Sequence, residues 1–388
     1  MVSEKPGISK DRIWIDGCFD FAHHGHAGAM LQARQLGNSL YVGVHSDEEI
    51  LENKGPVVMT LPERVLAVEA CKWATKAVPG APYVTDPAVM DEWGCFYVVH
   101  GDDITTDANG EDCYRVVKEA GRFLIVKRTP NISTTDLVGR MLLCTKNHHI
   151  QTVKDASKEA GLITRQNLDK FNTYATSEDG RSARDGVYIY AGDSLPATLI
   201  KPDEGFMKKQ RKMIYVDGGF DLFFAGHIEF LRLVSEASKS IANDLGEEVG
   251  IVVGIHDDAT VNKFKGLNYP IMNLFERALC VLQCKYVSHI VLQAPYSPSK
   301  QFIESLPWDI IRVMHGPTDF TASAMTDPYS EAKALGLYLE IANHQYSSIS
   351  TETIVERVTR NRGVYEERQR RKGWKAEVES KLLQAESQ

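Results

Sequence analysis

The sequence repeats its own motifs in the same order, and this repetition constrains the fold more than any other feature of the chain. DGCFDFAHHGH at 16–26 returns as DGGFDLFFAGH at 217–227, and GVHSDEEI at 43–50 returns as GIHDDATV at 254–261. Further matches follow in the same order: 54–64 with 265–277, 98–101 with 313–316, and 132–140 with 349–357. A repeat unit of roughly 135 residues has the size of one domain, so the chain is a duplicated domain and not a solenoid of short repeats.

The repeats divide the chain of 388 residues into two lobes, which we place at 10–145 and 212–362. The segment 146–211 between them contains TSEDGRSARDG and the basic KKQRK, a change of composition that predicts a linker with one short helix at 153–160. The charged segment 363–388 is expected to form a C-terminal helix or tail.

Within the first lobe, short apolar runs alternate with helical patterns. RIWIDG, LYVGVH, FYVVHG and FLIVKR read as strands, and the segments that follow them read as helices. This alternation predicts about five parallel strands with helices on both faces, that is, an α/β fold made of two tandem Rossmann-like, doubly wound domains. In such sheets ligands bind beyond the carboxyl ends of the strands.

Composition excludes several classes of protein. The formal net charge of −8 disfavours binding to nucleic acid, and no apolar run approaches the roughly 20 residues that span a bilayer. The first residues, MVSEKPGISKDR, contain no apolar signal segment, so we expect a cytoplasmic protein without stable membrane insertion. Seven cysteines, an odd number without a C-x-x-C pair, suggest neither a disulfide framework nor a zinc site.

His23 and His26 flank Gly25 where the first strand should pass into the first helix. Free N–H groups and the helix dipole favour an anion there, Gly25 allows close approach, and two imidazoles add hydrogen-bond donors. A metal site is the weaker alternative, because the motif offers no third ligand and lacks the i, i+4 spacing of a zinc helix. The other alternative is a helix cap with surface histidines.

Two more elements favour phosphate chemistry. Lys54 precedes Gly55 and Pro56 in a loop after the second strand, where an ammonium can reach a polyphosphate. Arg128 leads into TPNISTTD, where Ser133 and Thr134 are good helix caps and make a second anion site. Each feature alone fits a solvated side chain or an ordinary cap, but together they place four cationic or donor groups at one edge of a sheet.

These residues resemble the cytidylyltransferases of the HxGH nucleotidyltransferase superfamily. The resemblance rests on His23, Gly25 and His26 and on RTPNISTTD, which is similar to the family's R-T-x-G-I-S-T-[ST]-D. KGPVVMTLPER and HGDDI resemble it too, whereas Pro130 and Asn131 depart from the family's variable residue and glycine. Within the family, two tandem lobes resemble the branch that uses phosphoethanolamine, while the phosphocholine branch resembles one lobe followed by a long amphipathic membrane helix.

The resemblance implies transfer of the cytidylyl group of CTP to phosphoethanolamine, giving CDP-ethanolamine for phosphatidylethanolamine synthesis and releasing pyrophosphate. It implies Mg²⁺ accompanying CTP, without an assigned protein ligand. The catalytic residues would be His23, His26, Lys54 and Arg128. Residues implied to bind CTP are Gly17, Phe19, Gly25, His100, Gly101, Asp102, Ile132, Ser133 and Thr134. Those implied to bind phosphoethanolamine are Asp16, Tyr83 and Tyr114, a carboxylate and ring faces that suit an ammonium group; a turn cap and core tyrosines are the alternative.

The second copy tests the first. It keeps four counterparts, Asp217, His227, Lys265 and Tyr329, but has Phe224, Gln345 and Pro317 where the first copy has His23, Arg128 and Asp102. We therefore expect the second lobe to be non-catalytic, to bind nucleotide weakly or only to pack against the first. The lobes would then form an intramolecular pseudo-dimer in a monomeric protein. A phosphocholine enzyme, a non-catalytic CTP-binding regulator and a structural scaffold remain the alternatives.

Overall fold

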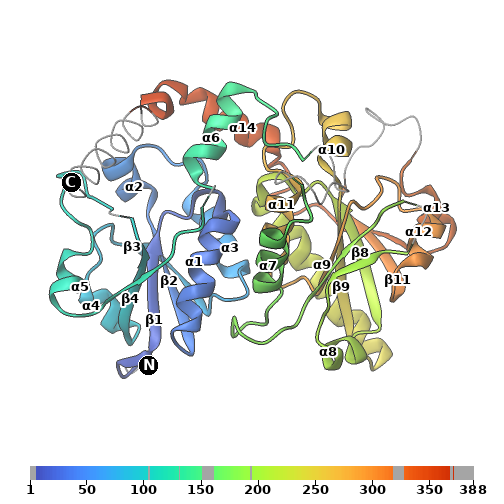
Figure 1. Ribbon diagram of the computed structural model, residues 1–388, viewed down its shortest axis with the longest axis horizontal. Helices are drawn as coiled ribbons and strands as arrows, with labels where there is room; N and C mark the ends of the chain where they lie inside the picture. Colours follow the sequence, from blue (N-terminus) through green and yellow to red (C-terminus); the bar gives the residue numbers. More distant parts are fainter. Residues whose placement is uncertain are drawn as a thin grey trace.

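The computed structural model describes residues 6–103, 105–130, 132–150, 161–192, 195–317, 327–367 and 370. Two lobes lie side by side, and each has a central β-sheet with helices on both faces (Figure 1). Within the described residues, no helix is both long and apolar enough to cross a bilayer. The predicted α/β architecture of two Rossmann-like lobes is confirmed.

The first sheet has five parallel strands in the order β3-β2-β1-β4-β5. Its strands are β1 (Ser9–Gly17), β2 (Ser39–His45), β3 (Lys76–Ala81), β4 (Cys95–Gly101) and β5 (Phe123–Val126). The central strand β1 carries a continuous buried run, Ile13 to Ile15, as expected for a parallel strand covered on both faces. Ile13 lies opposite Leu40 of β2 and Tyr97 of β4.

The helices of the first lobe are α1 (His24–Gln35), α2 (Asp47–Lys54), α3 (Leu61–Ala70), α4 (Pro87–Glu92), α5 (Arg115–Glu119) and α6 (Thr134–Leu143), with a 3₁₀ turn η1 (Asp20–Ala22). Side chains at their N-termini explain where three of them begin. Ser46 caps α2 and Ser133 caps α6 by accepting a backbone N–H, and Thr60 with Glu63 forms a capping box at α3. The helices therefore start directly after the loops that leave the sheet.

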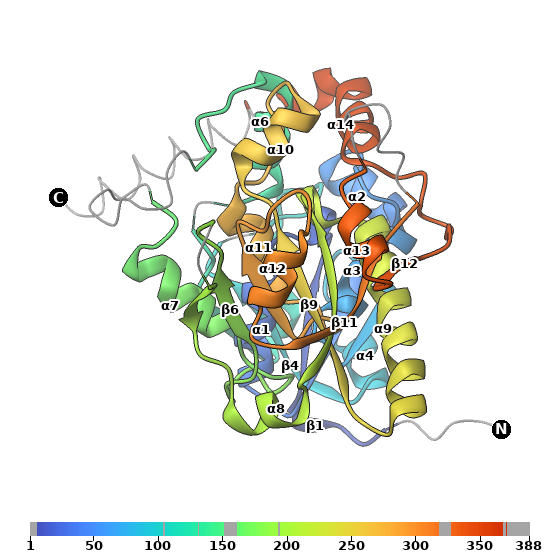
Figure 2. The same ribbon diagram turned by 90° about the vertical axis from the view of Figure 1, so that its right-hand side faces the viewer.

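The second sheet has seven strands in the order β12-β11-β8-β9-β10-β6-β7. Its strands are β6 (Gly186–Ile189), β7 (Ala197–Ile200), β8 (Lys212–Gly218), β9 (Val249–Ile255), β10 (His289–Leu292), β11 (Asp309–His315) and β12 (Tyr338–Glu340). Its helices are α9 (Ala225–Leu245), α10 (Asp258–Lys265), α11 (Leu274–Leu282), α12 (Lys300–Ser305), α13 (Ser330–Ala334) and α14 (Thr351–Arg360), with the turn η2 (Asp221–Phe223). Figure 2 shows this lobe, with β6 on one side of the sheet and β11 on the other.

The expectation of a plain linker at 146–211 is wrong. This segment forms α7 (Arg165–Tyr174), β6, β7 and α8 (Glu204–Lys209), and its strand β6 extends the second sheet by pairing in parallel with β10. β6 is a fully buried run of only four residues, GVYI, and its partner lies about 100 residues later in the chain, so no local pattern identified it. The helix expected at 153–160 and most of the 363–388 tail lie outside the described residues.

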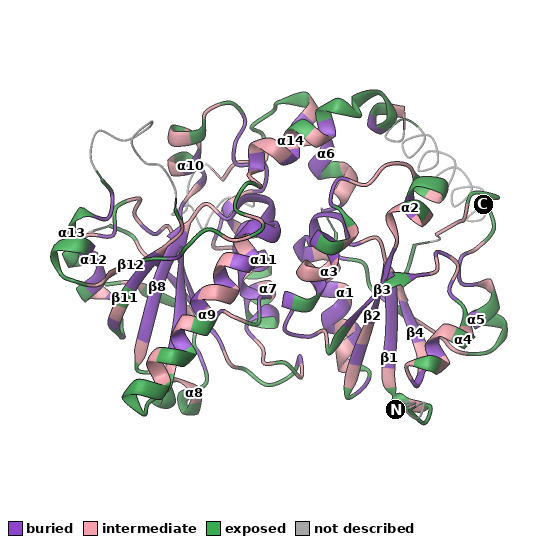
Figure 3. Cartoon of the chain, turned by 180° about the vertical axis from the view of Figure 1, so that it is seen from behind, coloured by how far each residue is buried: buried purple, intermediate pink, exposed green. Residues whose placement is uncertain are grey.

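The two lobes meet across a pseudo-twofold junction. Cys71 and Cys284, which are equivalent positions of the two repeats, face each other in an antiparallel β-bridge. Two reciprocal backbone hydrogen bonds flank this bridge, from Lys72 N to Gln283 O and from Lys285 N to Ala70 O, each 2.9 Å long. Figure 3 shows α1 and α3 of one lobe and α9 and α11 of the other on the two sides of the junction, and each of these helices includes buried residues. The contact is therefore isologous, like that of a twofold dimer.

Two equivalent arginines strengthen the junction. Arg140 of α6 forms a bidentate ion pair with Glu276 of α11, with N–O distances of 2.7 and 2.9 Å. Arg357 of α14 forms the equivalent pair with Glu63 of α3 at the same two distances. In Figure 1, α6 and α14 lie together at the top of the junction. Each lobe thus donates one arginine to the other.

The segment 161–192 adds a buried ion pair to the first lobe. The ammonium of Lys72 donates to Asp185 Oδ2 at 2.6 Å and to the carbonyl oxygen of Tyr174 at 2.7 Å, and both charged side chains are fully buried. The Tyr174 hydroxyl donates to the carbonyl oxygen of His24 at the start of α1. The segment 161–192 therefore packs against the first lobe and holds the start of α1.

Replacement of Lys72 by methionine should destabilise the protein by ~2 kcal/mol, because it leaves the buried Asp185 charge with Arg184 as its remaining cationic partner and removes the donor to Tyr174 O. Urea unfolding followed by circular dichroism measures the change. Lys118→Met is the control, since Lys118 pairs with Asp112 while 40% exposed and should change the free energy of unfolding by less than ~1 kcal/mol. Equal effects of the two variants would contradict a structural role for the buried pair.

Candidate active site

The predicted site residues gather at the carboxyl edge of the first sheet. Each follows the end of a strand: Asp16 and Gly17 at β1, Lys54 on α2 after β2, Tyr83 after β3, His100 and Gly101 at β4, and Arg128 after β5. Strand order changes direction between β1 and β4, which is where ligands bind in folds of this kind.

The two histidines of the HxGH motif stack on each other at the N-terminus of α1. The ring centroids of His23 and His26 are 3.9 Å apart with an interplanar angle of 16°, and the edge of Phe19 contacts His26 at 5.5 Å. His23 is the N-cap, and its Nδ1 accepts the backbone N–H of Gly25 at 3.1 Å. Because Nδ1 is the acceptor, the proton of a neutral His23 ring is on Nε2, where it can be donated to a ligand oxygen.

Gly25 makes this stack possible. A Cβ atom at this position would lie 2.8 Å from Cγ2 of Ile132 and 2.9 Å from the His23 ring. Both distances are shorter than van der Waals contact, so any side chain here would displace His23 or the Ile132 loop. Ile132 and Gly25 are thus brought together from the two predicted anion sites.

His26 lies in a buried and positively charged environment. Burial is the main cause that holds its pKa well below the usual value, and the nearby His23 and the charges of Lys54 and Arg128 lower the pKa further. His26 is therefore a neutral imidazole at pH 7, which can donate or accept a hydrogen bond but adds no charge. The same charges that disfavour a protonated His26 favour a phosphate beside it.

Lys54 and Arg128 carry the charge at this edge. Lys54 is exposed, its Nζ lies 3.9 Å from Cys18 Sγ, and it forms no ion pair with any described residue. Arg128 pairs with Asp103 at 3.2 Å, with both side chains nearly half exposed, and its backbone N–H donates to Asp102. The hydrogen bond to Asp102 holds the Arg128 backbone in place. The exposed pair with Asp103 is weak, so an anionic ligand can compete for the guanidinium.

The helix α6 supplies a second N-terminus near the first. Ser133 is its N-cap and accepts the N–H of Asp136 at 3.1 Å. The Thr134 hydroxyl donates to the carbonyl oxygen of Asp20, in the turn between β1 and α1, at 3.4 Å. This contact ties the second predicted anion site to the HxGH turn. Asn131, where the motif departs from the family pattern, lies outside the described residues.

Asp16 is the buried carboxylate of the site. Its Oδ1 accepts from the Tyr114 hydroxyl at 2.8 Å, and its Oδ2 accepts from Trp14 Nε1 at 2.9 Å and from the Thr85 hydroxyl at 2.7 Å. His100 lies over Tyr114 with ring centroids 4.6 Å apart. A carboxylate offers about four acceptor positions, so one remains for a cationic ligand.

Three residues that pack around Asp16 and Tyr83 were not predicted. Trp14 and Thr85 donate to Asp16, and His45, at the end of β2, packs against Tyr83 with ring centroids 5.1 Å apart while its Nδ1 contacts Ala81 O. The alternation of side chains along a strand could have shown that Trp14 and Asp16 share a face. Nothing local could have shown the Thr85 contact, which joins positions 69 residues apart.

Arg64 is a further residue whose role was missed. It is fully buried and joins three segments, donating to the carbonyl oxygens of Cys18 and Met59 and pairing with Asp47 at 2.6 Å. Its counterpart Arg277 makes the same kind of contacts in the second lobe. The repetition of Glu-Arg in both copies was the signal for this shared structural role.

The second lobe keeps the shape of the site but loses its charge. Phe224 takes the place of His23, and its ring lies 4.0 Å from that of His227, much as His23 lies on His26. Lys265, unlike Lys54, is neutralised by Glu352 at 2.7 Å, and the position equivalent to Glu352 is Thr135 in the first lobe. Gln345 is exposed and cannot replace the guanidinium of Arg128.

The buried carboxylate of the second lobe also differs. Oδ1 of Asp217 accepts from Tyr329 as Asp16 does from Tyr114, but Oδ2 lacks the two well-aligned donors that hold Oδ2 of Asp16. Tyr215 and Pro298 stand where the first lobe has the donors Trp14 and Thr85. Burial raises the pKa of Asp217 to about 7. At neutral pH this group is only partly ionised and a poor partner for a cation.

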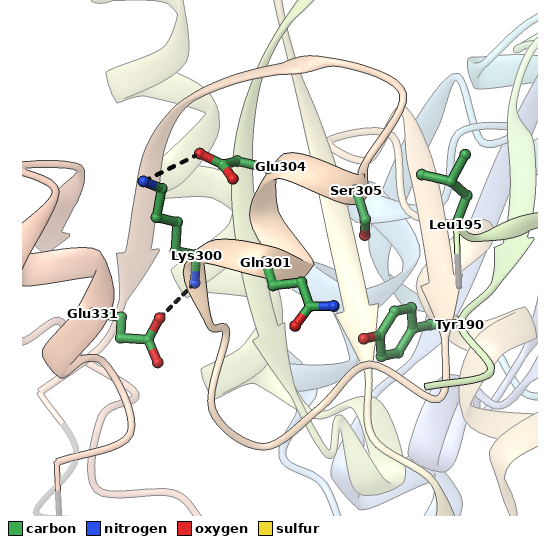
Figure 4. A pocket seen from close by; sticks show the side chains of 7 residues that line it. All are labelled: Tyr190, Leu195, Lys300, Gln301, Glu304, Ser305 and Glu331. Atoms are coloured by element: carbon green, nitrogen blue, oxygen red, sulfur yellow. Dashed lines mark hydrogen bonds and ion pairs between the residues drawn. The ribbon is translucent and has the colours of Figure 1, made fainter. Parts of the chain in front are cut away.

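A hollow of about 560 Å³ on the second lobe is unrelated to this site. Figure 4 shows its lining, in which Lys300 pairs with Glu304 and its backbone N–H donates to Glu331. Leu195 at its rim is 74% exposed. The cationic side chain of this hollow is already paired, and its residues belong to the loop after β6 and to α12 and α13, far along the chain from the HxGH turn.

Replacement of Asp217 by asparagine should remove a pH-dependent loss of stability. The folded pKa of about 7 exceeds the ~3.9 of an unfolded aspartate, so the contribution of Asp217 is complete below about pH 4 and is lost as the pH rises to about 7. Relative to the parent chain, Asp217→Asn should therefore gain up to ~4 kcal/mol across this range. Urea unfolding at several pH values measures it, and a constant difference would show that Asp217 titrates normally.

Comparison with known proteins agrees with this geometry. The cytidylyltransferase-like family matches residues 14–140 and 215–357. Ethanolamine-phosphate cytidylyltransferase of Dictyostelium discoideum is 42% identical over 366 residues, which cover 93% of this chain and 94% of the relative. The enzyme of that name from Mus musculus is 40% identical over 381 residues, covering 93% and 89%. Choline-phosphate cytidylyltransferase A of Homo sapiens is 39% identical over 133 residues, 34% of this chain and 36% of its own length. The chain belongs to the cytidylyltransferase-like family and, within it, to the ethanolamine-phosphate cytidylyltransferases.

Proposed function

We propose that this chain transfers the cytidylyl group of CTP to phosphoethanolamine, forming CDP-ethanolamine and pyrophosphate in the first lobe. The observation that carries the proposal is the stacked His23 and His26 pair at the start of α1, with Lys54 and Arg128 at the same sheet edge. The full-length similarity to ethanolamine-phosphate cytidylyltransferases supports the choice of acceptor.

The reaction is an in-line substitution at phosphorus. A phosphate oxygen of phosphoethanolamine forms a bond to the α-phosphorus of CTP, and the bond to the oxygen that bridges to the β-phosphate breaks, releasing pyrophosphate. The nucleophile is already anionic at pH 7, so no general base is needed. Catalysis then depends on holding the two substrates in line and on stabilising charge on the phosphate oxygens.

The residues divide this work by position. The His23 Nε2–H and the neutral His26 ring contact the α- and β-phosphate region, at the positive end of α1. Lys54 and Arg128 balance the triphosphate charge, with Arg128 leaving its exposed pair with Asp103. The N-terminus of α6 at Ser133 and Thr134 offers further N–H groups.

The ammonium group of phosphoethanolamine is assigned to the pocket of Asp16. The carboxylate is buried and held by three donors, one of them the hydroxyl of Tyr114, and Tyr83 belongs to the same buried cluster as Tyr114. A fixed carboxylate beside an aromatic ring is complementary to a small organic cation. Glycerol 3-phosphate has no such cation and should be a poor acceptor.

We propose that Mg²⁺ enters with CTP. The described residues contain no group of three histidine, cysteine or acidic side chains placed to hold a metal ion. Oxygens of the triphosphate and water would then supply most of its ligands, as is usual for Mg²⁺ bound to nucleotides. When bound, the ion would neutralise phosphate charge beside Lys54 and Arg128.

The second lobe is proposed to be non-catalytic and to occupy the place of a second subunit. Phe224, the paired Lys265 and the partly protonated Asp217 all weaken its capacity to bind a triphosphate and an amine. Since the junction already buries the pseudo-twofold surface, we propose a monomer.

We also propose a cytoplasmic location. Seven free cysteines support a reducing, cytoplasmic environment.

The direct test is pyrophosphate release by the purified full chain with CTP and Mg²⁺, using phosphoethanolamine, phosphocholine and glycerol 3-phosphate in parallel. We expect the highest kcat/KM with phosphoethanolamine. A preference for phosphocholine would reject the assigned acceptor while keeping the transfer chemistry. CTP binding without turnover of any acceptor would reject the enzyme and favour a regulatory protein.

Replacement of Gly25 by alanine should lower kcat/KM by ~100-fold, because the added Cβ displaces His23 from its stack on His26. The matched control is Gly226→Ala in the second lobe, where a Cβ would lie 2.8 Å from the Phe224 ring. It introduces the same clash away from the catalytic lobe and should change kcat/KM by less than ~2-fold. Similar losses in both variants would assign catalysis to both lobes.

A further inference from the structure

The loop that follows Lys54 is held in part by the other lobe. Lys54 ends α2, and the loop 55–60 connects it to α3. Gly55 follows with φ of 98°, a conformation that glycine adopts freely, so the backbone next to Lys54 has little intrinsic stiffness. The N–H of Gly55 donates to the carbonyl oxygen of Ile50 in α2 at 3.0 Å, so the position of the ammonium depends on α2 and on what fixes the loop directly after it.

The first lobe fixes the far end of the loop. The carboxylate of Asp20 accepts the backbone N–H groups of Val58 and Met59 at 2.9 and 2.8 Å, and Arg64 donates to Met59 O at 3.1 Å. These contacts lie four and five residues after Lys54. They anchor the start of α3 more directly than the lysine.

The second lobe contacts Val58 as well and, in addition, Pro56. Nη1 of Arg357 donates to the carbonyl oxygen of Val58 at 3.1 Å while the guanidinium pairs with Glu63. The Tyr365 hydroxyl donates to the carbonyl oxygen of Pro56 at 3.2 Å, two residues after Lys54. In Figure 1 the red segment that follows α14 crosses the junction and lies beside α2.

We propose that Arg357 and Tyr365 of the second lobe are positioning residues for the reaction of the first lobe, which they serve by fixing the loop that presents Lys54 to the triphosphate. Neither side chain needs to touch a substrate. The inference rests on the proposed role of Lys54 in binding CTP. It gives the non-catalytic lobe a defined part in catalysis beyond packing.

The pseudo-twofold symmetry provides a matched control within the same molecule. Arg140 makes the equivalent contacts in the opposite direction, to Glu276 and, at 3.0 Å, to the carbonyl oxygen of Ile271. It holds the loop that follows Lys265, which is neutralised by Glu352. Loss of Arg140 therefore weakens the same junction without releasing the catalytic lysine.

The experiment compares Arg357→Lys with Arg140→Lys in the full chain, with initial rates measured well below the unfolding transition. A lysine keeps the charge but cannot bind a carboxylate in two places and a carbonyl oxygen at once. We expect similar losses of stability, but a ~10-fold lower kcat/KM for CTP in Arg357→Lys alone. The KM for phosphoethanolamine should stay unchanged, because Asp16 and Tyr114 are not attached to this loop.

Tyr365→Phe is a second, milder variant that removes one hydroxyl and keeps the ring. It should lower kcat/KM for CTP by ~3-fold in the same direction, and it answers the question if Arg357→Lys fails to fold. The proposal is overturned if Arg357→Lys and Tyr365→Phe both keep the kcat/KM for CTP of the parent chain, or if Arg140→Lys loses as much kcat/KM for CTP as Arg357→Lys. These outcomes require an active parent chain, so they are distinct from failure of the proposed function, in which the parent chain itself is inactive.

Discussion

The two arginine–glutamate pairs across the junction are the contacts on which the rest of the molecule depends. Glu63 and Glu276 each belong to a capping box, so one carboxylate oxygen accepts both the N-cap backbone N–H and the guanidinium of the other lobe. Helix initiation, the preceding loop and the contact between lobes therefore share the same atoms. A bidentate, partly buried pair of this kind is far more restrictive than a surface salt bridge, because a small shift of either lobe breaks several bonds together.

Equivalent contacts explain how the two lobes keep the same backbone while their sites at the carboxyl edge of each sheet differ. Arg64 and Arg277 hold equivalent turns, and Asp20 and Asp221 accept equivalent backbone N–H groups, so the backbone of both lobes is kept. The differences concern groups that would face a ligand, among them Phe224 for His23. Lys265 is kept in the second lobe, but its ammonium pairs with Glu352. A charge that could bind phosphate is therefore neutralised within the protein.

Much of this arrangement could be predicted from the sequence. The features that were missed depend on contacts between residues that are distant in the chain. Ordered repeats and alternating strands and helices predicted the first sheet, and the placement of His23, Lys54 and Arg128 after strand ends predicted the site, because these patterns are local. The strand β6 was missed because its partner is distant in the chain. The roles of Arg140 and Arg357 were missed although both residues end a repeated motif, since their partners depend on how the lobes are oriented.

Fusion of the two lobes changes what each must preserve. In a dimer of identical subunits, every residue at the junction and at the site is duplicated, so neither copy can change alone. In a single chain the effective concentration of the second lobe is high, and the junction persists without help from two active sites. The second lobe can then lose the histidine stack and the free lysine, but not Arg357, whose contacts with Glu63 and Val58 lie on the catalytic side of the junction. Selection on the second lobe then acts on the residues that contact the first lobe. This accounts for a degenerate site beside an intact interface.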